Sequence, residues 1–541
     1  MFETRLTAER IRKHEASGAW TGRTLFESVA GHATRTPAAR AVYDASGSYS
    51  YEDIVRLSTR VAHGLRELGV RSQDVVAVQL PNWREFVPTF LGIERIGAVV
   101  NPLATILRER ELRQMLQVGR ARVLVVPANF RGWPHAERAV QLLRDLPDLK
   151  HIVVVGGTRM SGTVWWDELL ELGSRWERDK ISPRGGTEIC ELAFTSGTTG
   201  QPKGVLHSHN SAVCAVRSTV RRQGFDSHDV FHVASPVGHN AGYFYGVRLA
   251  LEAGGRLVMQ DFWDADLMVE LVRSHRVTYS LGSPTHLFDM LGSQSATREA
   301  LSSLRVYICS GADLPRHLAR SALDVIPQAL CRVFGMTEIG HATSTDNESP
   351  RDKLIETDGN PQPEMSIRIV AEDDRVLPAG IEGHVHVRGA FMFAGYLQGP
   401  ELTDEYFTGD WFHTGDLGRV DADGYLCLTG RIKDVIIRGA EKLPVREIEE
   451  VLGEHPRIVE VALIPVTDSR LGERAVACVR LRDGGALGLG DVTSFLADRR
   501  VTTQFWPERV VVMDSFPKTP AGKIQKPLLR QLVEGDDNRG E

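Results

Sequence analysis

The chain has 541 residues, a formal net charge of −6 and a pI near 6.3. Its hydrophobic share of 42% and charged share of 25% are ordinary for a globular protein, and the length allows more than one domain. Because there is no basic excess, we expect no nucleic-acid partner and no attraction to an anionic membrane.

Two further features narrow the class of protein. Residues 1–10 lack the apolar core of a signal peptide, and the longest apolar runs, such as 123–127 and 152–155, are as long as a strand and far too short for a membrane span. The six cysteines are scattered, without a Cys-x-x-Cys pair or a close Cys/His cluster. The sequence therefore predicts neither a zinc site nor a disulfide framework, and we expect a cytoplasmic protein.

The N-terminal part alternates between helix-like and strand-like segments. Residues 1–50 read as an irregular arm with one amphipathic helix at 24–33, and residues 51–68 carry apolar side chains at helical spacing. The following segments are strand 74–78, helix 85–96, strand 98–102, helix 109–116, strand 123–126 and strand 151–155. Strands that alternate with helices predict a mostly parallel α/β sheet.

A second alternating run, over about 205–340, predicts a second α/β subdomain. Its expected elements are helix 210–222, strand 229–233, helix 243–251, strand 256–259, helix 264–274, strand 278–281 and strand 304–310. After about 345, short alternating runs such as 383–389 and 424–430 predict antiparallel strands in a small barrel-like subdomain.

A domain boundary is expected near Lys433, in the charged segment 430–434. We predict an N-terminal domain over 1–432 and a small α+β C-terminal domain over 433–541. The expected fold class is α/β, with two α/β subdomains and the barrel-like subdomain making up the large N-terminal domain.

The most informative stretch is 195–204, which reads Thr-Ser-Gly-Thr-Thr-Gly-Gln-Pro-Lys-Gly between two strand-like runs. Its glycines let backbone N–H groups turn inward around an anion, its hydroxyls add donors and Lys203 adds a positive charge. It is not a Walker A loop, because Gly204 follows the lysine where Ser or Thr is required. The alternative is an ordinary surface turn. The candidate phosphate-binding residues are Thr195, Ser196, Gly197, Thr198, Thr199, Gly200 and Lys203.

Two segments are candidates for contacts with a nucleotide base and phosphate. Phe334-Gly335-Met336-Thr337-Glu338 follows a predicted strand, where an aromatic ring can stack on a base, Thr337 can bond a phosphate and Glu338 can hold Mg²⁺. Gly311-Ala312 ends the preceding strand and could lie flat against a purine. The alternatives are a loop with a capping threonine and a solvated glutamate, and a plain strand-to-loop glycine.

Three charged residues further along complete the candidate nucleotide site. Asp416, just after a tight turn, offers two acceptor oxygens to ribose hydroxyls, and Arg431 adds a positive charge. Lys523 lies in Pro-Lys-Thr-Pro-Ala-Gly-Lys-Ile at 517–524, on a Gly-containing loop between two extended pieces. The alternatives are a common turn aspartate and a surface lysine.

In this order, the motifs at 195–204, 310–312, 334–338, 414–416, 430–434 and 517–523 resemble the motif set of the adenylate-forming superfamily. This superfamily contains acyl- and aryl-CoA ligases, adenylation domains of peptide synthetases, and luciferases. The resemblance covers nearly the whole chain. Segments 80–86, 95–103, 108–112, 125–132 and 504–509 are most similar to the cyclohexanecarboxylate-CoA ligase group.

The resemblance implies that a carboxylate and ATP form acyl-AMP and pyrophosphate, after which a thiol, usually of CoA, displaces AMP. For the phosphates, the resemblance implies that Lys203 and its loop hold the β- and γ-phosphates, that Glu338 holds Mg²⁺ and that Thr337 bonds the α-phosphate. Lys523 would reach the α-phosphate and the substrate carboxylate. For the nucleoside, Asp416 and Arg431 would hold ribose, Gly311, Ala312 and Phe334 would frame adenine, and Gly335 and Met336 would complete the nucleotide set.

The resemblance also implies that the C-terminal domain is a mobile lid that rotates between the two half-reactions. Lys433 would be the hinge, and the loop with Arg438, Gly439 and Ala440 would approach the thiol tunnel. His239 matches a family position near the acyl pocket and is a candidate catalytic residue. The further pocket candidates are Asn240, Gly242, Tyr243, Gly282, Ser283 and His341.

Four residues bear on how far the resemblance extends. Phe334 replaces a commoner Tyr and should still stack, whereas Arg332 stands where the family has a small polar residue. Ala440 replaces the second glycine of a usual Gly-Gly, which bears on CoA as acceptor. Asn240 keeps a hydroxybenzoate substrate open, because similar aryl-acid ligases place an Asn there.

Three functions compete. The first is a CoA ligase for a cyclic, aromatic or medium-chain acid, and the second is a stand-alone adenylating enzyme that loads the phosphopantetheine of a carrier protein. The third, a non-catalytic nucleotide-binding protein, would need neither the lysine at 523 nor the hinge at 433. A homodimer is expected by family analogy alone.

Overall fold

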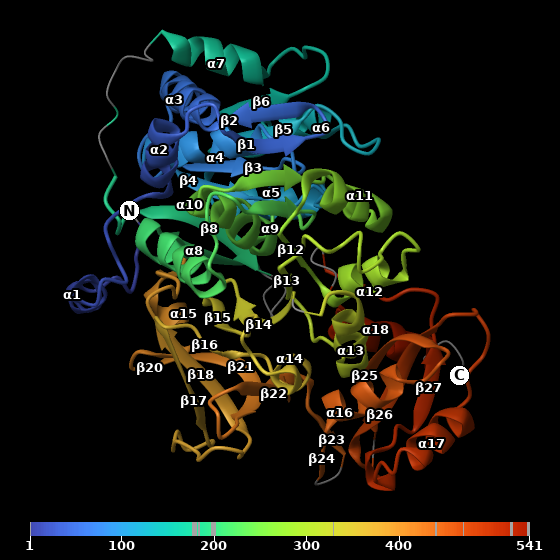
Figure 1. Cartoon of the computed structure of the whole chain (residues 1–541). Coiled ribbons are helices and arrows are strands. Elements are labelled where there is room, and N and C mark those ends of the chain that lie inside the picture. The colour runs from blue at the N-terminus through green and yellow to red at the C-terminus, as the bar shows by residue number, and fades with distance from the viewer. Residues whose placement is uncertain are drawn as a thin grey trace.

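The computed structural model describes residues 2–175, 181, 184–195, 202–327, 329–438, 441–468, 470–519 and 523–537. Within these residues the strands form four sheets, and helices alternate with strands along most of the chain, so the predicted α/β class is confirmed. The two large sheets and their helices occupy the upper and middle parts of Figure 1, and the two smaller sheets lie below them. Every described helix is too short or too polar to pass through a bilayer.

The first alternating strands and helices of the chain form the first large sheet and its helices. Its strand order is β19-β9-β8-β4-β3-β5-β6-β7. The strands are β3 (Val75–Val78), β4 (Val99–Pro102), β5 (Ala121–Pro127), β6 (His151–Val155), β7 (Val164–Trp165), β8 (Ile189–Thr195), β9 (Lys203–Ser208) and β19 (Gly395–Tyr396). The helices between them are α3 (Tyr51–Glu67), α4 (Phe86–Arg95), α5 (Glu109–Val118), α6 (His135–Leu142) and α7 (Trp166–Ser174). Strands β3 to β7 run parallel, as predicted.

The second large sheet has the order β16-β15-β14-β13-β12-β10-β11-β1-β2. Its strands are β1 (Arg40–Asp44), β2 (Gly47–Ser50), β10 (Val230–Val233), β11 (Arg256–Met259), β12 (Tyr279–Gly282), β13 (Val306–Cys309), β14 (Leu330–Met336), β15 (Gly340–Ser344) and β16 (Asn360–Pro361). Its helices are α8 (His209–Gln223), α9 (Asn240–Gly242), the π-helix η1 (Tyr243–Arg248), α10 (Leu249–Ala253), α11 (Ala265–His275), α12 (Pro284–Gly292), α13 (Arg316–Val325) and α14 (Arg351–Glu356).

The prediction of an irregular arm over 1–50 is wrong in part. Two helices, α1 (Ala8–Ala16) and α2 (Leu25–Arg35), and the hairpin of β1 and β2 form there. Strand β1 pairs parallel with β11, far along the chain, and thereby extends the second sheet. A strand of five residues has too short an alternation to be recognised without its partner, because cross-strand pairing supplies much of its stability.

The two smaller sheets confirm the predicted change of character after residue 345. One contains β17 (Met365–Val370), β18 (Gly383–Gly389), β20 (Phe407–Thr408), β21 (Trp411–Val420) and β22 (Leu426–Arg431), all antiparallel, with α15 (Pro400–Asp404) nearby. The other contains β23 (Ile436–Arg438), β24 (Glu441–Leu443), β25 (Ile458–Asp468), β26 (Gly472–Leu481) and β27 (Arg509–Val512). Helices α16 (Val445–Gly453), α17 (Leu489–Asp498) and α18 (Lys526–Asp537) accompany it, with short 3₁₀ turns η2 (Ile432–Asp434) and η3 (Thr503–Phe505).

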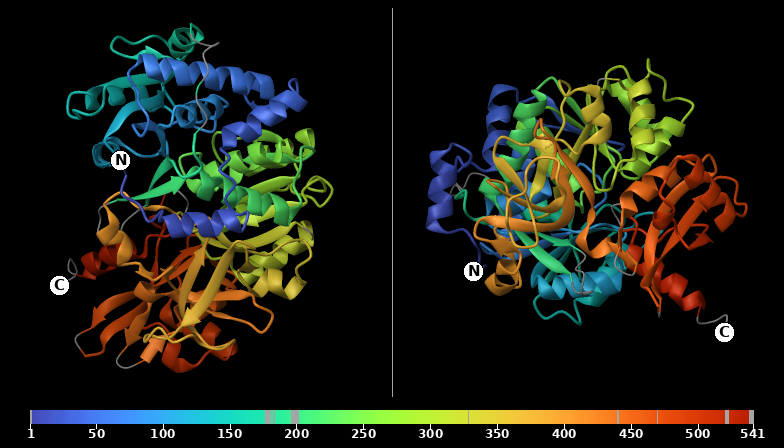
Figure 2. Two further views of the ribbon diagram at one scale, coloured as in Figure 1. Left: turned by 90° about the vertical axis from the view of Figure 1, so that its left-hand side faces the viewer. Right: turned by 90° about the horizontal axis from the view of Figure 1, so that it is seen from below.

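The C-terminal elements form a lobe of their own, seen from below in the right-hand view of Figure 2. Buried apolar side chains within this lobe, among them Ile448 and Leu463, make a core separate from the one under the large sheets. The turn η2, which contains Lys433, connects the two parts. The domain limits at 432 and 433 stay a prediction.

A buried asparagine ties the two large sheets together where their parallel strands end. The side-chain nitrogen of Asn82, after β3, lies 3.2, 3.0 and 2.9 Å from the carbonyl oxygens of Val233, Ser235 and Gln260. Its side-chain oxygen accepts a bond of 2.9 Å from the Val237 backbone. Because Asn82 is 2% exposed, water has little access to replace these bonds.

We expect Asn82→Ala to lower the free energy of unfolding by at least about 2 kcal/mol, since it leaves buried backbone groups without partners. Differential scanning calorimetry of the purified protein should show a fall of several degrees in the unfolding midpoint. The control is Asn347→Ala, whose exposed side chain donates a bond of 3.0 Å to the Arg305 carbonyl and accepts a long contact of 4.0 Å from the Cys331 thiol. Equal midpoints for the two variants would contradict the role of Asn82.

Candidate active site

The candidate phosphate loop connects two paired strands, as the sequence predicts. Strands β8 and β9 are antiparallel, with Thr195 opposite Lys203 at the start of the loop. The Lys203 ammonium group bonds the Tyr406 hydroxyl and lies 4.3 Å from the centre of that ring. Ser196, Gly197, Thr198, Thr199 and Gly200 lie outside the described residues.

Glu338 is buried at the end of the β14–β15 hairpin, close to Lys203. Its carboxylate accepts a hydrogen bond of 2.9 Å from the Tyr396 hydroxyl. Burial raises the pKa of Glu338, against the opposing effects of that bond and of the Lys203 and Arg431 charges. A further cation placed beside this carboxylate would therefore stabilise its ionised form.

The same hairpin holds Phe334, Gly335, Met336 and Thr337. A side chain at Gly335 would place its first carbon 2.3 Å from the Gly340 carbonyl oxygen, so the close approach of the two strands requires glycine. The backbone carbonyl of Thr337 accepts a bond of 2.7 Å from His207 Nε2, while its side chain makes no such bond among the described residues. Phe334 is buried and belongs to the main apolar core.

Asp416, Arg431 and Lys523 come together from three segments. Asp416 on β21 lies opposite Arg431 on β22, and their side chains form an ion pair at 3.1 Å. The second carboxylate oxygen of Asp416 is buried and has no hydrogen-bond partner among the described residues, and burial raises the pKa of this group. An unpaired acceptor at this position is suited to a hydroxyl donor from a ligand.

Lys523 reaches this group from the C-terminal lobe. The loop that carries it begins and ends in an antiparallel bridge between Lys518 and Ile524, as predicted for a lysine between two extended pieces. Burial and the Arg431 charge lower the pKa of Lys523 to about 8, against the opposing attraction of Asp416. The ammonium group thus sits in a partly desolvated site beside both partners.

A cavity of about 230 Å³ opens at one edge of the two large sheets. Its walls follow the carboxyl ends of β4, β5, β10, β11, β12 and β13, the edge at which parallel α/β sheets bind ligands. Most of its lining is apolar or aromatic. The lining residues are Ala104, Thr105, Ile106, Phe130, Arg131, Ala234, Ser235, Pro236, His239, Ala241, Asp261, Phe262, Trp263, Leu281, Gly282, Ser283, His286, Ser310 and Gly311.

The predicted pocket residues divide into two groups. His239, Gly282 and Ser283 line the cavity, as does Gly311 from the predicted adenine segment, next to the exposed Ala312. Burial lowers the pKa of His239, so its ring is neutral near pH 7. Gly311 has a φ of +87°, a left-handed conformation that favours glycine.

The other predicted pocket residues are not among those that line the cavity. The Tyr243 hydroxyl is bonded to Glu94 at 3.2 Å and Arg248 at 2.9 Å inside the core, and His341 stacks on Tyr245 at 3.3 Å between ring centres. A side chain at Gly242 would come within 2.3 Å of the Ser235 carbonyl, which explains glycine there by packing. Asn240 has a buried side-chain oxygen without a partner among the described residues.

Sequence reasoning missed two side chains of the cavity wall, Trp263 and His286. Trp263 meets the His286 ring edge-on at 4.5 Å, and His286 Nδ1 bonds the Ser283 hydroxyl at 2.8 Å. Burial lowers the pKa of His286 to about 4. The signal available was Phe262-Trp263 directly after the predicted strand 256–259, at the same sheet edge as the other candidates.

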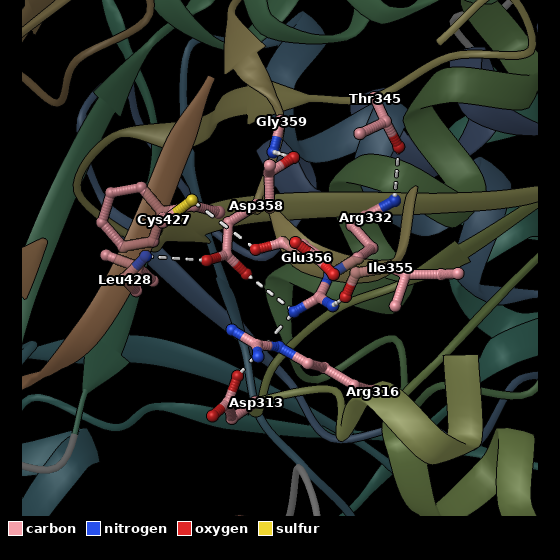
Figure 3. Close-up of polar contacts among 12 residues, drawn as sticks. Asp313, Arg316, Arg332, Thr345, Ile355, Glu356, Asp358, Gly359, Cys427 and Leu428 are labelled. Carbon is pink, nitrogen blue, oxygen red and sulfur yellow. Dashed lines mark hydrogen bonds and ion pairs between the residues drawn. The ribbon is translucent and has the colours of Figure 1, made fainter. Parts of the chain in front are cut away.

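Arg332, whose role near adenine the sequence left open, is committed to an internal network. Its guanidinium donates to the Ile355 carbonyl at 2.6 Å and pairs with Asp358 at 3.1 Å, as Figure 3 shows. Asp358 also accepts a bond of 2.9 Å from the Leu428 backbone, which links β14 to β22. The large side chain therefore supports the strand that carries Phe334.

The predicted thiol-tunnel residues lie mainly on the C-terminal side. Lys433 is exposed in the turn η2. Arg438 pairs with Glu508 and donates to the Trp506 carbonyl at 3.1 Å, inside the C-terminal lobe. Gly439 and Ala440 lie outside the described residues.

Away from this site, the fold brings together one set of side chains that the spacing of His and Cys did not reveal. One ligand atom each from Asp374, His386 and His413 lies within 4.8 Å of the others. The Arg368 guanidinium, however, is 3.4 Å from His386 Nδ1. A positive charge already beside that nitrogen opposes a cation bound through it.

Comparisons with known proteins agree with the geometry. Residues 29–397 match the family model described as AMP-binding enzyme, and residues 447–523 match the AMP-binding enzyme C-terminal domain. The medium-chain fatty-acid–CoA ligase of Escherichia coli (strain K12) is 32% identical over 538 residues, which cover 97% of this chain and 93% of that protein. The 2,3-dihydroxybenzoate-AMP ligase of Bacillus subtilis (strain 168) is 30% identical over 530 residues, with 97% and 96% covered.

A solved structure is similar over the same extent. The crystal structure of ATP-bound MatB from Rhodopseudomonas palustris has a TM-score of 0.85 to this chain, with 27% identity and coverage of 95% of this chain and 99% of that one. Because one family model matches well over half of the chain and a second matches its C-terminal part, the chain belongs to the AMP-binding enzyme family and is an adenylate-forming acid–thiol ligase.

Proposed function

We propose that the enzyme activates an aromatic, cyclic or medium-chain carboxylic acid and transfers its acyl group to CoA. In the first step a carboxylate oxygen bonds to the α-phosphorus of ATP, the bond from that phosphorus to the bridging oxygen breaks, and pyrophosphate leaves. In the second step the CoA sulfur bonds to the acyl carbon, AMP leaves and the thiol proton passes to solvent.

The observation that carries the proposal is that Lys523, from the C-terminal lobe, lies within electrostatic range of the Asp416–Arg431 ion pair. Attack of a carboxylate on a phosphate brings two anions together, so the site must supply positive charge where it develops. Lys523 supplies it at the reacting atoms, Lys203 faces the leaving phosphates, and Arg431 and Asp416 hold the ribose. Partial burial strengthens each of these interactions, because less water screens them.

Glu338 has the chemistry to hold Mg²⁺. This ion prefers carboxylate and phosphate oxygens and usually binds one or two carboxylates together with the phosphates of its substrate. Glu338 is buried, and that burial raises its pKa. The hydrogen bond from the Tyr396 hydroxyl orients its carboxylate, so one carboxylate is available to the ion. When bound there, the ion would neutralise charge on the β- and γ-phosphates, which the nearby Lys203 also does.

The cavity supports the substrate class. Phe130, Phe262 and Trp263 offer flat apolar surfaces for a ring or an alkyl chain, and Gly282 and Gly311 leave space at the cavity wall. A volume of about 230 Å³ suits a compact acid better than a long-chain one. His239, neutral near pH 7, lies on the wall and is proposed to contact the substrate and the incoming thiol.

A second function differs in the thiol acceptor. The Bacillus subtilis relative is named as a 2,3-dihydroxybenzoate-AMP ligase, whereas the Escherichia coli relative is named as a fatty-acid–CoA ligase. A stand-alone adenylating enzyme would load a carrier-protein phosphopantetheine instead of CoA. Asn240 does not line the cavity, but it lies between the lining residues His239 and Ala241, and its buried side-chain oxygen has no partner among the described residues, so a hydroxylated aromatic acid stays an alternative substrate.

We further propose that residues 1–432 and 433–541 are two domains, with Lys433 as the hinge. The turn η2 connects two separate cores, which permits the C-terminal lobe to move as a unit. Lys523 would then leave Asp416 after adenylation, and the loop after Arg438 would take part in thioester formation. A hinge at an exposed turn can absorb the change in backbone angles.

Removal of the Lys523 ammonium group should slow acyl-AMP formation about 10²–10³-fold, as expected when a group that stabilises transition-state charge is lost. The measurement is ATP–pyrophosphate exchange with Lys523→Ala. The control is Lys518→Ala, in the same loop, whose ammonium pairs with Glu460 away from the site. Unchanged exchange in Lys523→Ala would show that this lysine has another role.

The pH dependence gives an independent check of the same residue. Because the pKa of Lys523 is lowered to about 8, its charged form is present below pH 8 and is lost as the pH rises through that value. We expect kcat/KM for ATP in the exchange reaction to fall above about pH 8. In Lys523→Arg the charge persists, since an arginine pKa is about 12 or more, so the fall should disappear even if the rate is lower.

A panel of acids tests the substrate and the acceptor together. We expect exchange with benzoate, hydroxybenzoates, cyclohexanecarboxylate or medium-chain fatty acids, and little with palmitate. Mass spectrometry should detect the CoA thioester of whichever acid supports exchange. Exchange without a CoA thioester would indicate that the thiol acceptor is a carrier protein. A preference for palmitate would contradict the proposed substrate class.

A further inference from the structure

One arginine of the C-terminal lobe is inserted into an acidic site on the rest of the chain. Arg446, in the first turn of α16, bonds the Asp313 carboxylate and the Leu428 carbonyl and lies 3.7 Å from an oxygen of Asp358. Its side chain is 14% exposed. Arg446 is therefore nearly withdrawn from water, with most of its partners across the boundary.

The residues around Arg446 alternate in charge. Arg332 lies 3.1 Å from Asp358 and 3.9 Å from Asp313, so two arginines share two aspartates. Burial would raise the pKa of Asp358, but Arg446 and Arg332 hold it below its usual value. Figure 3 shows Asp313, Arg332 and Asp358 turned toward one another from separate parts of the chain. If the C-terminal lobe moved away, this set would keep both negative charges and lose one positive charge.

A second ion pair links α16 to helix α13 of the N-terminal part. Arg316 on α13 pairs with Glu450 on α16 at 3.4 Å, and Glu450 also lies 3.5 Å from Arg446. Helix α16 is thus held from two sides by charged partners on the N-terminal part. Such pairs depend on the relative position of the two parts, whereas contacts inside the C-terminal lobe do not.

The network is attached directly to the proposed adenine site. Asp313 is the next residue after Gly311 and Ala312, and Arg332 is two residues before Phe334 on β14. An adenine held between these segments would fix the backbone on which Asp313 and Arg332 stand. Nucleotide binding and docking of α16 would therefore favour each other, because both need the same arrangement of these two segments.

We propose that Arg446 is a positioning residue for the first half-reaction: its contacts with Asp313, Asp358 and Leu428 hold the C-terminal lobe where Lys523 reaches Asp416. The proposal rests on the function proposed above for Lys523. Loss of Arg446 leaves the nucleotide site and Lys523 intact but leaves Asp313 and Asp358 short of a positive partner. The equilibrium then shifts away from the arrangement that supports adenylation.

The experiment compares the two half-reactions in Arg446→Gln. We expect ATP–pyrophosphate exchange to fall about tenfold or more, which corresponds to a shift of one decade in the population of the competent arrangement. Thioester formation from synthetic acyl-AMP and CoA should stay within about twofold of the wild-type rate, because it does not require Lys523 at Asp416. Arg446→Lys should recover part of the exchange, since it restores the charge without the bidentate geometry.

The matched control is Arg499→Gln, which removes an ion pair with Glu454 inside the C-terminal lobe. It should leave both half-reactions unchanged. Equal losses in both half-reactions of Arg446→Gln, or full exchange, would overturn the proposal. Absence of exchange in the wild-type enzyme with every acid would instead contradict the function proposed for the site, so the two failures are distinguishable.

A measurement that does not depend on the thiol acceptor completes the test. Dyes attached through Ser295→Cys and Asp498→Cys, both exposed, report the distance between the two parts by energy transfer. With α,β-methylene-ATP bound, we expect one dominant population in the otherwise wild-type protein and a second, distinct population in Arg446→Gln. Identical distributions would overturn the proposal.

Discussion

The site depends on bringing a lysine ammonium group from the C-terminal lobe within electrostatic range of a buried carboxylate on another sheet. Placing Lys523 near Arg431 is unfavourable by itself, because two positive charges approach each other with little water between them. The negative charge of Asp416 offsets this repulsion. The antiparallel register of β21 and β22 sets Asp416 opposite Arg431. Two cations around one anion leave a net positive site, which is what an incoming triphosphate and carboxylate require.

The cavity follows from how the two large sheets meet. Parallel strands end at the same edge, and the loops after six of them contribute walls to one cavity. Asn82 holds the loops of both sheets in place through buried backbone bonds, so the cavity has a rigid floor. Side chains from separate loops meet at the cavity wall, as Trp263 and Ser283 do around His286.

The charged network around Arg332 explains a departure from the family pattern. A small polar residue at this position would leave Asp358 without its partner at 3.1 Å, and Asp358 would then depend on Arg446 alone. With Arg332 present, the acidic site is preserved whether or not the C-terminal lobe is docked. This makes repeated docking and release feasible, since neither arrangement leaves the buried Asp358 carboxylate without a positive partner.

The sequence by itself determined the α/β class, the order of most strands and helices, and the nucleotide motifs, because periodicity and glycine-rich loop chemistry are local properties of the chain. Lys523, Asp416 and Arg431 were candidates from the sequence, and the resemblance to the adenylate-forming superfamily implied their roles. Strand β1, the aromatic wall at Trp263 and the position of Tyr243 in the core were decided by the tertiary structure alone, since each depends on partners distant in the chain. The same holds for Arg446, whose partners Leu428 and Asp313 lie 18 and 133 positions away, so that only the folded arrangement reveals these contacts.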